Sequence, residues 1–122
     1  MDREKVKTLI QQKNDNFRKN VLKIAANDHN HFHPSPAIQH LYLTQPEQFF
    51  RLLEEVMFYT GFDEDNDPWR EHDLAFFEFN DTRYFWKIEY FDKNFEYGVE
   101  DKDKLNDEVC KRRLILAEAS EY

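Results

Sequence analysis

Residues 74–91 read LAFFEFNDTRYFWKIEYF, and this stretch decides the fold. Two apolar, aromatic-rich runs flank the triplet Asn80-Asp81-Thr82, which has the composition of a tight hairpin turn. The second run alternates between an aromatic side and a charged side, namely Tyr84, Trp86, Ile88 and Tyr90 against Arg83, Lys87 and Glu89. Alternation with period two is typical of a strand with one buried face. We therefore predict an antiparallel β-hairpin with strands at 74–79 and 83–91.

A helix is predicted before this hairpin. Thr44-Gln45-Pro46-Glu47 has a Thr followed three residues later by Glu, the pattern of a capping box, and proline is tolerated in a first helical turn. The apolar positions that follow recur at helical spacing as far as about Tyr59. Gly61 is then placed to end the helix as its C-cap.

The two ends of the chain are predicted to be helical as well. Residues 2–20 carry a narrow apolar stripe in a charged segment, so we expect a peripheral helix there. Residues 21–25 fit either a short strand or a continuation of that helix, and residues 27–36 are rich in turn formers. A last helix is predicted from Asn106 to the end of the chain.

These elements predict one α+β domain over residues 1–122, with residues 1–24 at its edge. The expected order is amino-terminal helix, central helix, antiparallel hairpin or small sheet, and carboxy-terminal helix. Phe, Tyr and Trp make up 16% of the chain, and these large side chains close a core that contains little valine.

Charge is distributed unevenly along the chain, whose net charge is −8. Residues 1–24 hold seven basic against three acidic residues, a net of +4. Residues 61–81 hold eight acids against Arg70 alone, a net of −7, and residues 89–108 hold eight acids against three lysines, a net of −5. Phosphate backbones are repelled by such acidity, so direct nucleic-acid binding is not expected.

Other classes of protein are disfavoured by what the sequence lacks. Cys110 is the only cysteine, which excludes an intrachain disulfide and fits a reducing compartment. We expect it to be a small core residue in the last helix. The chain has no apolar run of about twenty residues, so no membrane association is expected and a cytoplasmic location is predicted. Gly61 and Gly98 lie far apart and make no phosphate-cradling loop, so no cofactor is expected.

Several motifs resemble a family of small bacterial proteins of unknown function. The pattern DNDP-x-x-EHD is matched by residues 65–68 and 71–73, and FWKIDYYD by residues 85–92. LND-x-x-R near the amino terminus is similar to residues 13–18. The closing segment, with an Arg, an apolar run and Glu-Tyr, is similar to Arg113, residues 114–117 and Glu121-Tyr122.

The resemblance implies a shared fold and no established activity. Leu74-Ala75 stands where the family has Phe-Gly, a His- and Pro-rich loop at 29–36 replaces an apolar, Gly-containing segment, and residues 101–104 replace a DPADP-like loop. The family's genes resemble cargo of plasmids and phages, which indicates a genetic context and not a chemistry.

Two groups of residues are candidate metal ligands. Oxygen ligands and an imidazole gather in residues 65–73, at Asp65, Asp67, Glu71, His72 and Asp73. Clustered oxygens suit Ca²⁺ or Mg²⁺, and an added His suits Mn²⁺ or Zn²⁺, but the spacing matches no known motif. Asp and Asn also hydrogen-bond their own backbone in turns, and a His before a strand is often a satisfied ring. The second group, His29, His31 and His33 with His40 further on, is better explained as a solvated loop.

The two acidic segments bracket the hairpin and are expected to share one end of the domain. A charge run is commonly just a solvated face. The functional interpretation is mimicry, since spaced carboxylates imitate a phosphate track and occupy the cationic groove of a protein. The predicted partner contacts are Asp63, Glu64, Asp65, Asp67, Glu71, Asp73, Glu100, Asp101 and Asp103.

Three functions are consistent with this sequence. The first is an inhibitor that binds a bacterial nucleic-acid-handling defence complex, of the anti-CRISPR or anti-restriction kind. The second is a metal-dependent enzyme that uses the cluster at 65–73, with His72 or Glu71 as ligand or base. The third is a regulatory partner that binds one cognate protein through the basic first helix.

Overall fold

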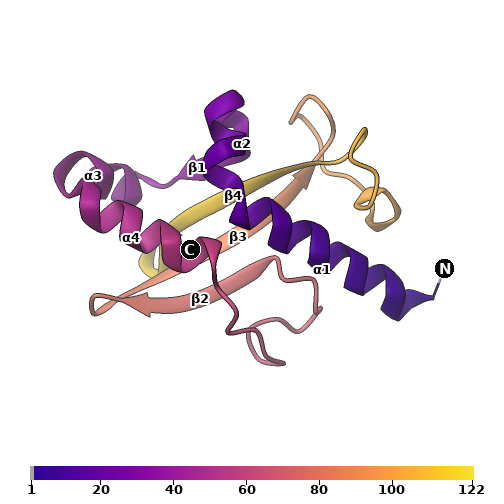
Figure 1. Cartoon of the computed structure of the whole chain (residues 1–122), viewed down its shortest axis with the longest axis horizontal. Coiled ribbons are helices and arrows are strands. Elements are labelled where there is room, and N and C mark those ends of the chain that lie inside the picture. Colours follow the sequence, from indigo (N-terminus) through magenta and orange to yellow (C-terminus); the bar gives the residue numbers. More distant parts are fainter. Residues whose placement is uncertain (1) are drawn as a thin grey trace.

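The computed structural model describes residues 2–122 and has an α+β fold. Its helices and strands follow one another along the chain as shown in Figure 1. The order is α1 (Arg3–Lys19), α2 (Val21–Asn27), η1 (His29–His31), β1 (Phe32–Pro34), α3 (Pro36–Thr44), α4 (Pro46–Met57), β2 (Leu74–Phe79), β3 (Thr82–Phe91), η2 (Asp101–Asp103), β4 (Lys111–Glu118) and η3 (Ala119–Glu121).

The predicted hairpin is confirmed and forms half of a four-stranded sheet in the order β1-β4-β3-β2. Phe79 pairs with Thr82, which leaves Asn80 and Asp81 as a two-residue turn. Their φ angles are 49° and 64°, the left-handed values that a type I′ turn requires at both positions. β3 and β4 are antiparallel, whereas β1 runs parallel to β4.

The predicted carboxy-terminal helix is wrong, because residues 111–118 form strand β4. Leu114 lies opposite Ile88 and Leu116 lies opposite Trp86, and both leucines are fully buried. Residues 114–117 are apolar at every position, so their pattern does not distinguish a strand from a helix. β2 pairs with only one side of β3, so the backbone N–H and C=O groups on the other side of β3 need hydrogen-bond partners. A strand at residues 111–118 provides them, and a helix would not. Cys110 is buried as predicted, but it precedes β4 and is not helical.

Of the two alternatives for residues 21–25 the helix is confirmed, whereas two local predictions at the ends of the central helix are wrong. Residues 21–25 lie in helix α2 and not in a strand. The predicted capping box does not form, since Gln45 is the N-cap of α4 and the Thr44 hydroxyl donates to the His40 carbonyl at the end of α3. α4 ends at Met57, so Gly61 is not its cap.

Helix α3 was not predicted, and its signal was present in the loop 27–36. Ser35 is the N-cap and its hydroxyl accepts a hydrogen bond from the Ile38 amide, while Pro36 occupies the first helical position. Both are typical helix-start features that the surrounding turn formers obscured.

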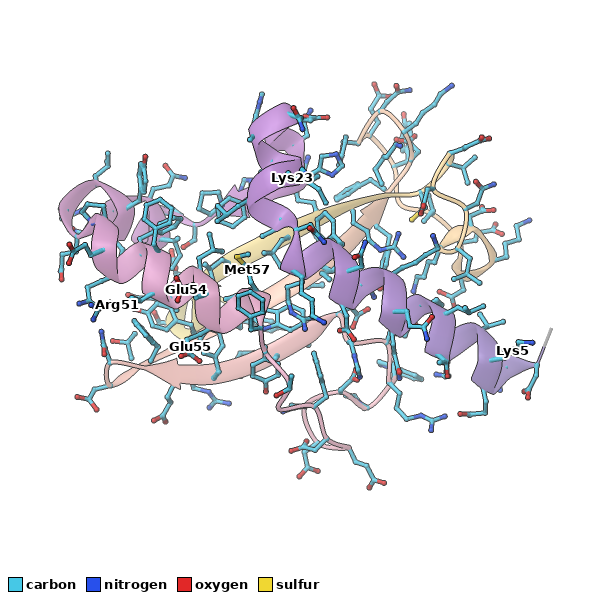
Figure 2. All side chains as sticks on the ribbon, viewed as in Figure 1. Lys5, Lys23, Arg51, Glu54, Glu55 and Met57 are labelled. Atoms are coloured by element: carbon cyan, nitrogen blue, oxygen red, sulfur yellow. The ribbon has the colours of Figure 1, made fainter. Side chains whose placement is uncertain are left out.

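The core lies between the sheet and the helices that cover one of its faces. Tyr84, Trp86 and Ile88 of β3 point into it, as the alternation predicted, and Trp86 is fully buried at its centre. A Trp86→Ala change is expected to cost about 3–5 kcal/mol of stability. α4 contributes its buried side, whereas Arg51, Glu54 and Glu55 are exposed on its outer side (Figure 2).

The first helix is less peripheral than its sequence suggested. α1 buries one side against the domain with the side chains of Ile10, Asn14, Phe17 and Arg18. Two of these four are polar, which explains why the apolar stripe is narrow. Within residues 2–122, no helix combines the length and the apolarity that a membrane span requires.

Candidate functional site

The tip of the first acidic loop is a turn built by its own side chains. The Asp63 carboxylate accepts hydrogen bonds from the amides of Asp65 and Asn66, each at 2.9 Å. Asn66 completes the turn, since its side-chain oxygen accepts from the Asp63 amide and its Nδ2 donates to the Gly61 carbonyl. This local bonding holds the exposed side chains of Glu64 and Asp65 at the outer end of the loop.

Asp67 lies on the buried side of the same loop and holds its backbone by hydrogen bonds. Its side chain is only 5% exposed, and its carboxylate accepts from the amides of Glu71 and His72 at 3.2–3.3 Å. Arg70 and His72 both have left-handed backbones, with φ of 55° and 56°. Such conformations are costly for residues with side chains, and here the Arg70 amide donates to the Asp67 carbonyl and the His72 amide to the Asp67 carboxylate, which stabilises both.

His72 joins this loop to helix α1. Its Nδ1 lies 3.0 Å from an Asp15 carboxylate oxygen, and its Nε2 lies 3.7 Å from Asp67. The ring stacks on Phe62, with the two ring centres 3.9 Å apart and the planes nearly parallel. Asp15 also binds the buried guanidinium of Arg18, whose pKa burial lowers. His72 is therefore a satisfied ring that positions the loop.

A buried polar network lies beneath the loop, between α1 and the sheet. The Tyr90 hydroxyl donates to Asp73 at 3.0 Å and accepts from the Asn14 amide group at 2.7 Å. Asn14 in turn accepts from Arg112 Nε at 2.6 Å and donates to the Glu71 carbonyl. Burial raises the pKa of the Asp73 carboxyl, and burial together with the charge of Asp73 raises the pKa of Tyr90.

Lys104 links the two acidic loops. Its ammonium lies 3.0 Å from Glu71 in the first loop and 2.9 Å from Asp101 in the second. Burial lowers the pKa of Lys104, but the hydrogen bonds to Asp101 and Glu71 outweigh this effect and raise it. Arg112 Nη2 donates to the Lys104 carbonyl at 2.8 Å and so fixes the backbone of the second loop as well.

The basic first helix contacts both acidic segments. Lys7 donates to the Trp69 carbonyl at 2.7 Å, and Lys13 forms an ion pair with Asp107 at 3.0 Å. Arg70, the only basic residue of segment 61–81, pairs with Glu4 of α1. The positive and negative segments of the sequence therefore lie against one another in the fold.

The nine predicted partner contacts fall into two groups. Asp67 is buried, and Glu71 and Asp73 are partly buried with hydrogen-bond partners inside the domain. Asp67 is thus not available at the surface, contrary to the prediction. The remaining six are exposed or partly exposed, and they are Asp63, Glu64, Asp65, Glu100, Asp101 and Asp103.

The candidate metal ligands do not converge. Among the residues described, no group of three or more His, Cys, Asp or Glu side chains is placed to hold a metal ion. The alternate histidines do not share one side of an extended segment either, because His29 and His31 lie in η1 and only His33 lies in β1. The Nδ1 atom of His31 binds the Arg112 carbonyl at 2.7 Å.

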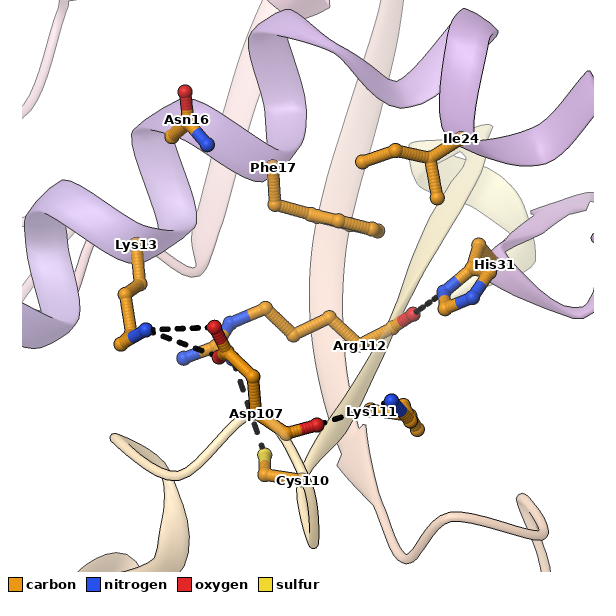
Figure 3. Close-up of a pocket in the computed structure, with 9 residues that line it drawn as sticks. All are labelled: Lys13, Asn16, Phe17, Ile24, His31, Asp107, Cys110, Lys111 and Arg112. Carbon is orange, nitrogen blue, oxygen red and sulfur yellow. Dashed lines mark hydrogen bonds and ion pairs between the residues drawn. The ribbon is translucent and has the colours of Figure 1, made fainter. Parts of the chain in front are cut away.

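A pocket of about 230 Å³ opens beside the network, between α1, α2 and the start of β4 (Figure 3). Phe17 and Ile24 form an apolar wall, and Lys13 and Lys111 both bind Asp107, through its carboxylate and its carbonyl. Cys110 lies in the same pocket, where burial raises the pKa of its thiol. A raised pKa keeps a thiol protonated, and a protonated thiol is a weak nucleophile.

Residues 35–121 match a family model described as a protein of unknown function, DUF3768. The chain belongs to this family. No curated protein and no solved structure gives a significant match to the chain.

The DUF3768 region contains both acidic loops and strands β2, β3 and β4, but it begins after α1. The inner network crosses this boundary, since Asn14 and Asp15 of α1 bind Tyr90 and His72 of the matched region.

Sequence reasoning missed three members of the network, namely Tyr90 as a polar link, Lys104 and Arg112. The alternation predicts Tyr90 only as part of the aromatic, buried side of the second strand, and its polar role comes from its hydroxyl group. The closing motif pointed to Arg113, whereas the buried arginine is Arg112, which lies opposite Tyr90 in the β3–β4 register. Knowing that residues 111–118 form a strand would have placed Arg112 on the inner face.

Proposed function

We propose that the chain is an acidic protein-binding inhibitor of a nucleic-acid-handling bacterial defence complex, of the anti-CRISPR or anti-restriction kind, acting in the cytoplasm. The observation that carries the proposal is the position of Lys104, which binds Glu71 of one acidic loop and Asp101 of the other. Both loops are therefore attached to one frame, and their outer carboxylates are presented in a defined arrangement. A preorganised charged surface loses less entropy on binding than a flexible one.

The contact residues are the six outer carboxylates, which are Asp63, Glu64, Asp65, Glu100, Asp101 and Asp103. They meet lysines and arginines in a groove that otherwise holds a nucleic-acid backbone. Asp67, Glu71 and Asp73 have a different role in this proposal, because they hold the loops in place. Charge-driven association of this kind is fast and weakens as salt rises.

The proposal is tested by co-purification from bacterial cells that carry nucleic-acid-targeting defence systems. The tagged chain is expected to retain a defence effector at low ionic strength and to release it as salt is raised. A quadruple variant, with Glu64→Gln, Asp65→Asn, Glu100→Gln and Asp103→Asn, is expected to lose the effector.

The control changes the exposed Glu54 and Glu55 of α4 to Gln, and it is compared with the double variant Glu64→Gln and Asp65→Asn, which removes the same number of negative charges. The control changes the net charge on a different element, so it is expected to retain the effector. Equal loss in both double variants would mean that only net charge matters, and retention in the quadruple variant would overturn the contact surface. Binding that does not respond to salt would also count against the proposal.

The metal-dependent enzyme gains no support from the geometry. Its five candidate side chains do not gather around one point in the described chain, and four of them, all but Asp65, have structural partners. We therefore propose no second function.

A further inference from the structure

The outer edge of strand β2 has backbone groups that pair with no other strand. The Asp73 carbonyl accepts a hydrogen bond from the Ile88 amide at 2.8 Å, which fixes the pattern of the ladder. Alternate pairs exchange hydrogen bonds in an antiparallel ladder, so Ala75, Phe77 and Phe79 bond to β3. The N–H and C=O groups of Leu74, Phe76 and Glu78 therefore point away from β3. β2 is the last strand of the sheet, and no helix or strand of the described chain runs along its outer side (Figure 1).

The opposite edge of the sheet is protected, which makes the open edge of β2 distinctive. β1 has only three residues and ends in Pro34, which has no N–H. The Phe32 amide donates to the His29 carbonyl, and the Gln39 side chain donates to the Pro34 carbonyl. β2 has six residues, keeps an unbroken register and contains no Pro or Lys. Short strands, proline and charged side chains, lysine above all, are the usual protection of sheet edges, and of these β2 has only the single charge of Glu78.

We propose that the β2 edge is a homodimer interface, in which β2 of a second copy of this chain pairs antiparallel across a two-fold axis at Phe76. The pairing is self-complementary. Phe76 faces its own counterpart, and Leu74 faces Glu78 of the second copy. The two glutamates are therefore never opposite each other, although each chain carries a net charge of −8.

The charges of the neighbouring strand support the same register. In the strand register Glu78 lies opposite Arg83 of its own chain and Leu74 lies opposite Lys87, and the Arg83 guanidinium lies over the Phe76 ring, 5.1 Å from its centre. In the dimer, Glu78 has two cross-strand neighbours on the same face of the sheet. One is Arg83 of its own chain, and the other is Leu74 of the second copy, which lies beside Lys87 of that copy. Phe85, which pairs with Phe76, extends the contact into a row of four phenylalanines on that face. Each of the three facing pairs exchanges two backbone hydrogen bonds.

Sedimentation equilibrium of the full chain measures this dimer directly. A mass of twice 15.0 kDa is expected at high concentration, in reversible equilibrium with the monomer. Phe76→Pro removes the backbone N–H of residue 76, which does not bond to β3. Proline is tolerated in a strand where the N–H faces solvent. This variant is expected to raise the dimer dissociation constant at least about tenfold, roughly 1.4 kcal/mol.

Two further measurements make the test specific. Phe76→Lys places a typical edge-protecting residue at the same position and is expected to give a monomer, whereas Phe50→Lys changes an exposed phenylalanine of α4 and is expected to leave the dimer intact. Circular dichroism establishes that each variant is folded. In the wild-type dimer, the amides of Phe76 and Glu78 are expected to exchange slowly with solvent.

Three results would overturn the inference. They are a wild-type chain that stays monomeric at high concentration, a dimer that persists in both folded Phe76 variants, and fast amide exchange at Phe76 and Glu78 in a dimer. Protection of these amides only by a strand of another protein would also exclude the second copy as occupant. None of these outcomes bears on the acidic loops, so the dimer and the proposed function are tested independently.

Discussion

The acidic residues of this protein form an inner set and an outer set that differ in what their carboxylates bind. Asp67, Glu71 and Asp73 accept hydrogen bonds or ion pairs from within the domain. Glu64, Asp65 and Glu100 are exposed. Buried charges must be compensated, whereas exposed charges interact weakly with the rest of the fold. The inner set should therefore control stability, and the outer set should be free to serve binding.

The largest effect is expected at Arg112, which anchors the inner network. Arg112→Met removes hydrogen bonds from a buried guanidinium to Asn14 and to the Lys104 carbonyl. We predict a loss of about 3–5 kcal/mol in the free energy of unfolding in urea, since hydrogen bonds of charged groups contribute about 1.5–3 kcal/mol each. Arg113→Met is the control, because Arg113 is only partly buried and binds the Asn30 carbonyl. A larger loss of stability for Arg113→Met than for Arg112→Met would show that Arg112 is not the residue that anchors the network.

The next effect is expected from one hydroxyl group. Tyr90→Phe leaves the partly buried carboxylate of Asp73 without its donor, at a predicted cost of about 1–3 kcal/mol. The matched change Tyr97→Phe removes a hydroxyl from a side chain that is 71% exposed, so the same urea titration should detect no difference there. Equal stability of Tyr90→Phe and wild type would show that the network contributes nothing net.

A smaller effect is expected for the link between the loops, and it depends on pH. The raised pKa of Lys104 means that the folded state holds this proton more tightly than the unfolded chain. The resulting stabilisation is complete below the ordinary lysine pKa of 10.5 and is lost as pH rises through the higher folded value. The stability of the wild type should therefore fall towards that of Lys104→Gln above pH 10.5.

Urea titrations at a series of alkaline pH values check this trend. Burial raises the pKa of Tyr90 as well, so both proteins lose stability as the pH rises above the ordinary tyrosine value, and the difference between the two stability curves, not either curve alone, reports on Lys104. A gap that stays constant or widens with rising pH would contradict the assignment of Lys104 as the charged link.

The smallest effect is expected in the outer set. The double change Glu64→Gln and Asp65→Asn alters two exposed side chains at the loop tip. We predict a stability within about 0.5 kcal/mol of wild type by thermal or urea unfolding. A loss above about 1 kcal/mol would mean that the outer carboxylates are part of the structure and are not free for a partner.

The sequence predicted the secondary structure well in the hairpin, where the pattern depends only on a strand that is adjacent in the chain. The alternation in β3 and the Asn80-Asp81 turn are local signals, and both strands of the hairpin were placed within one residue. The candidate site was predicted only as a list of acids. No sequence pattern separates Asp67, which is 5% exposed, from Glu64, which is exposed, because burial depends on segments far along the chain.

By itself, the sequence determined the α+β class, the aromatic hairpin and the uneven charge along the chain. These features follow from side-chain alternation and composition, which need no knowledge of distant contacts. Only the tertiary structure decided that residues 111–118 form a strand, that Arg112 is the buried arginine and that α1 lies against the acidic loops. The strand depends on pairing with β3, and the other two depend on hydrogen bonds and charges between residues about 60 to 100 positions apart, such as Asn14 with Arg112 and Lys13 with Asp107.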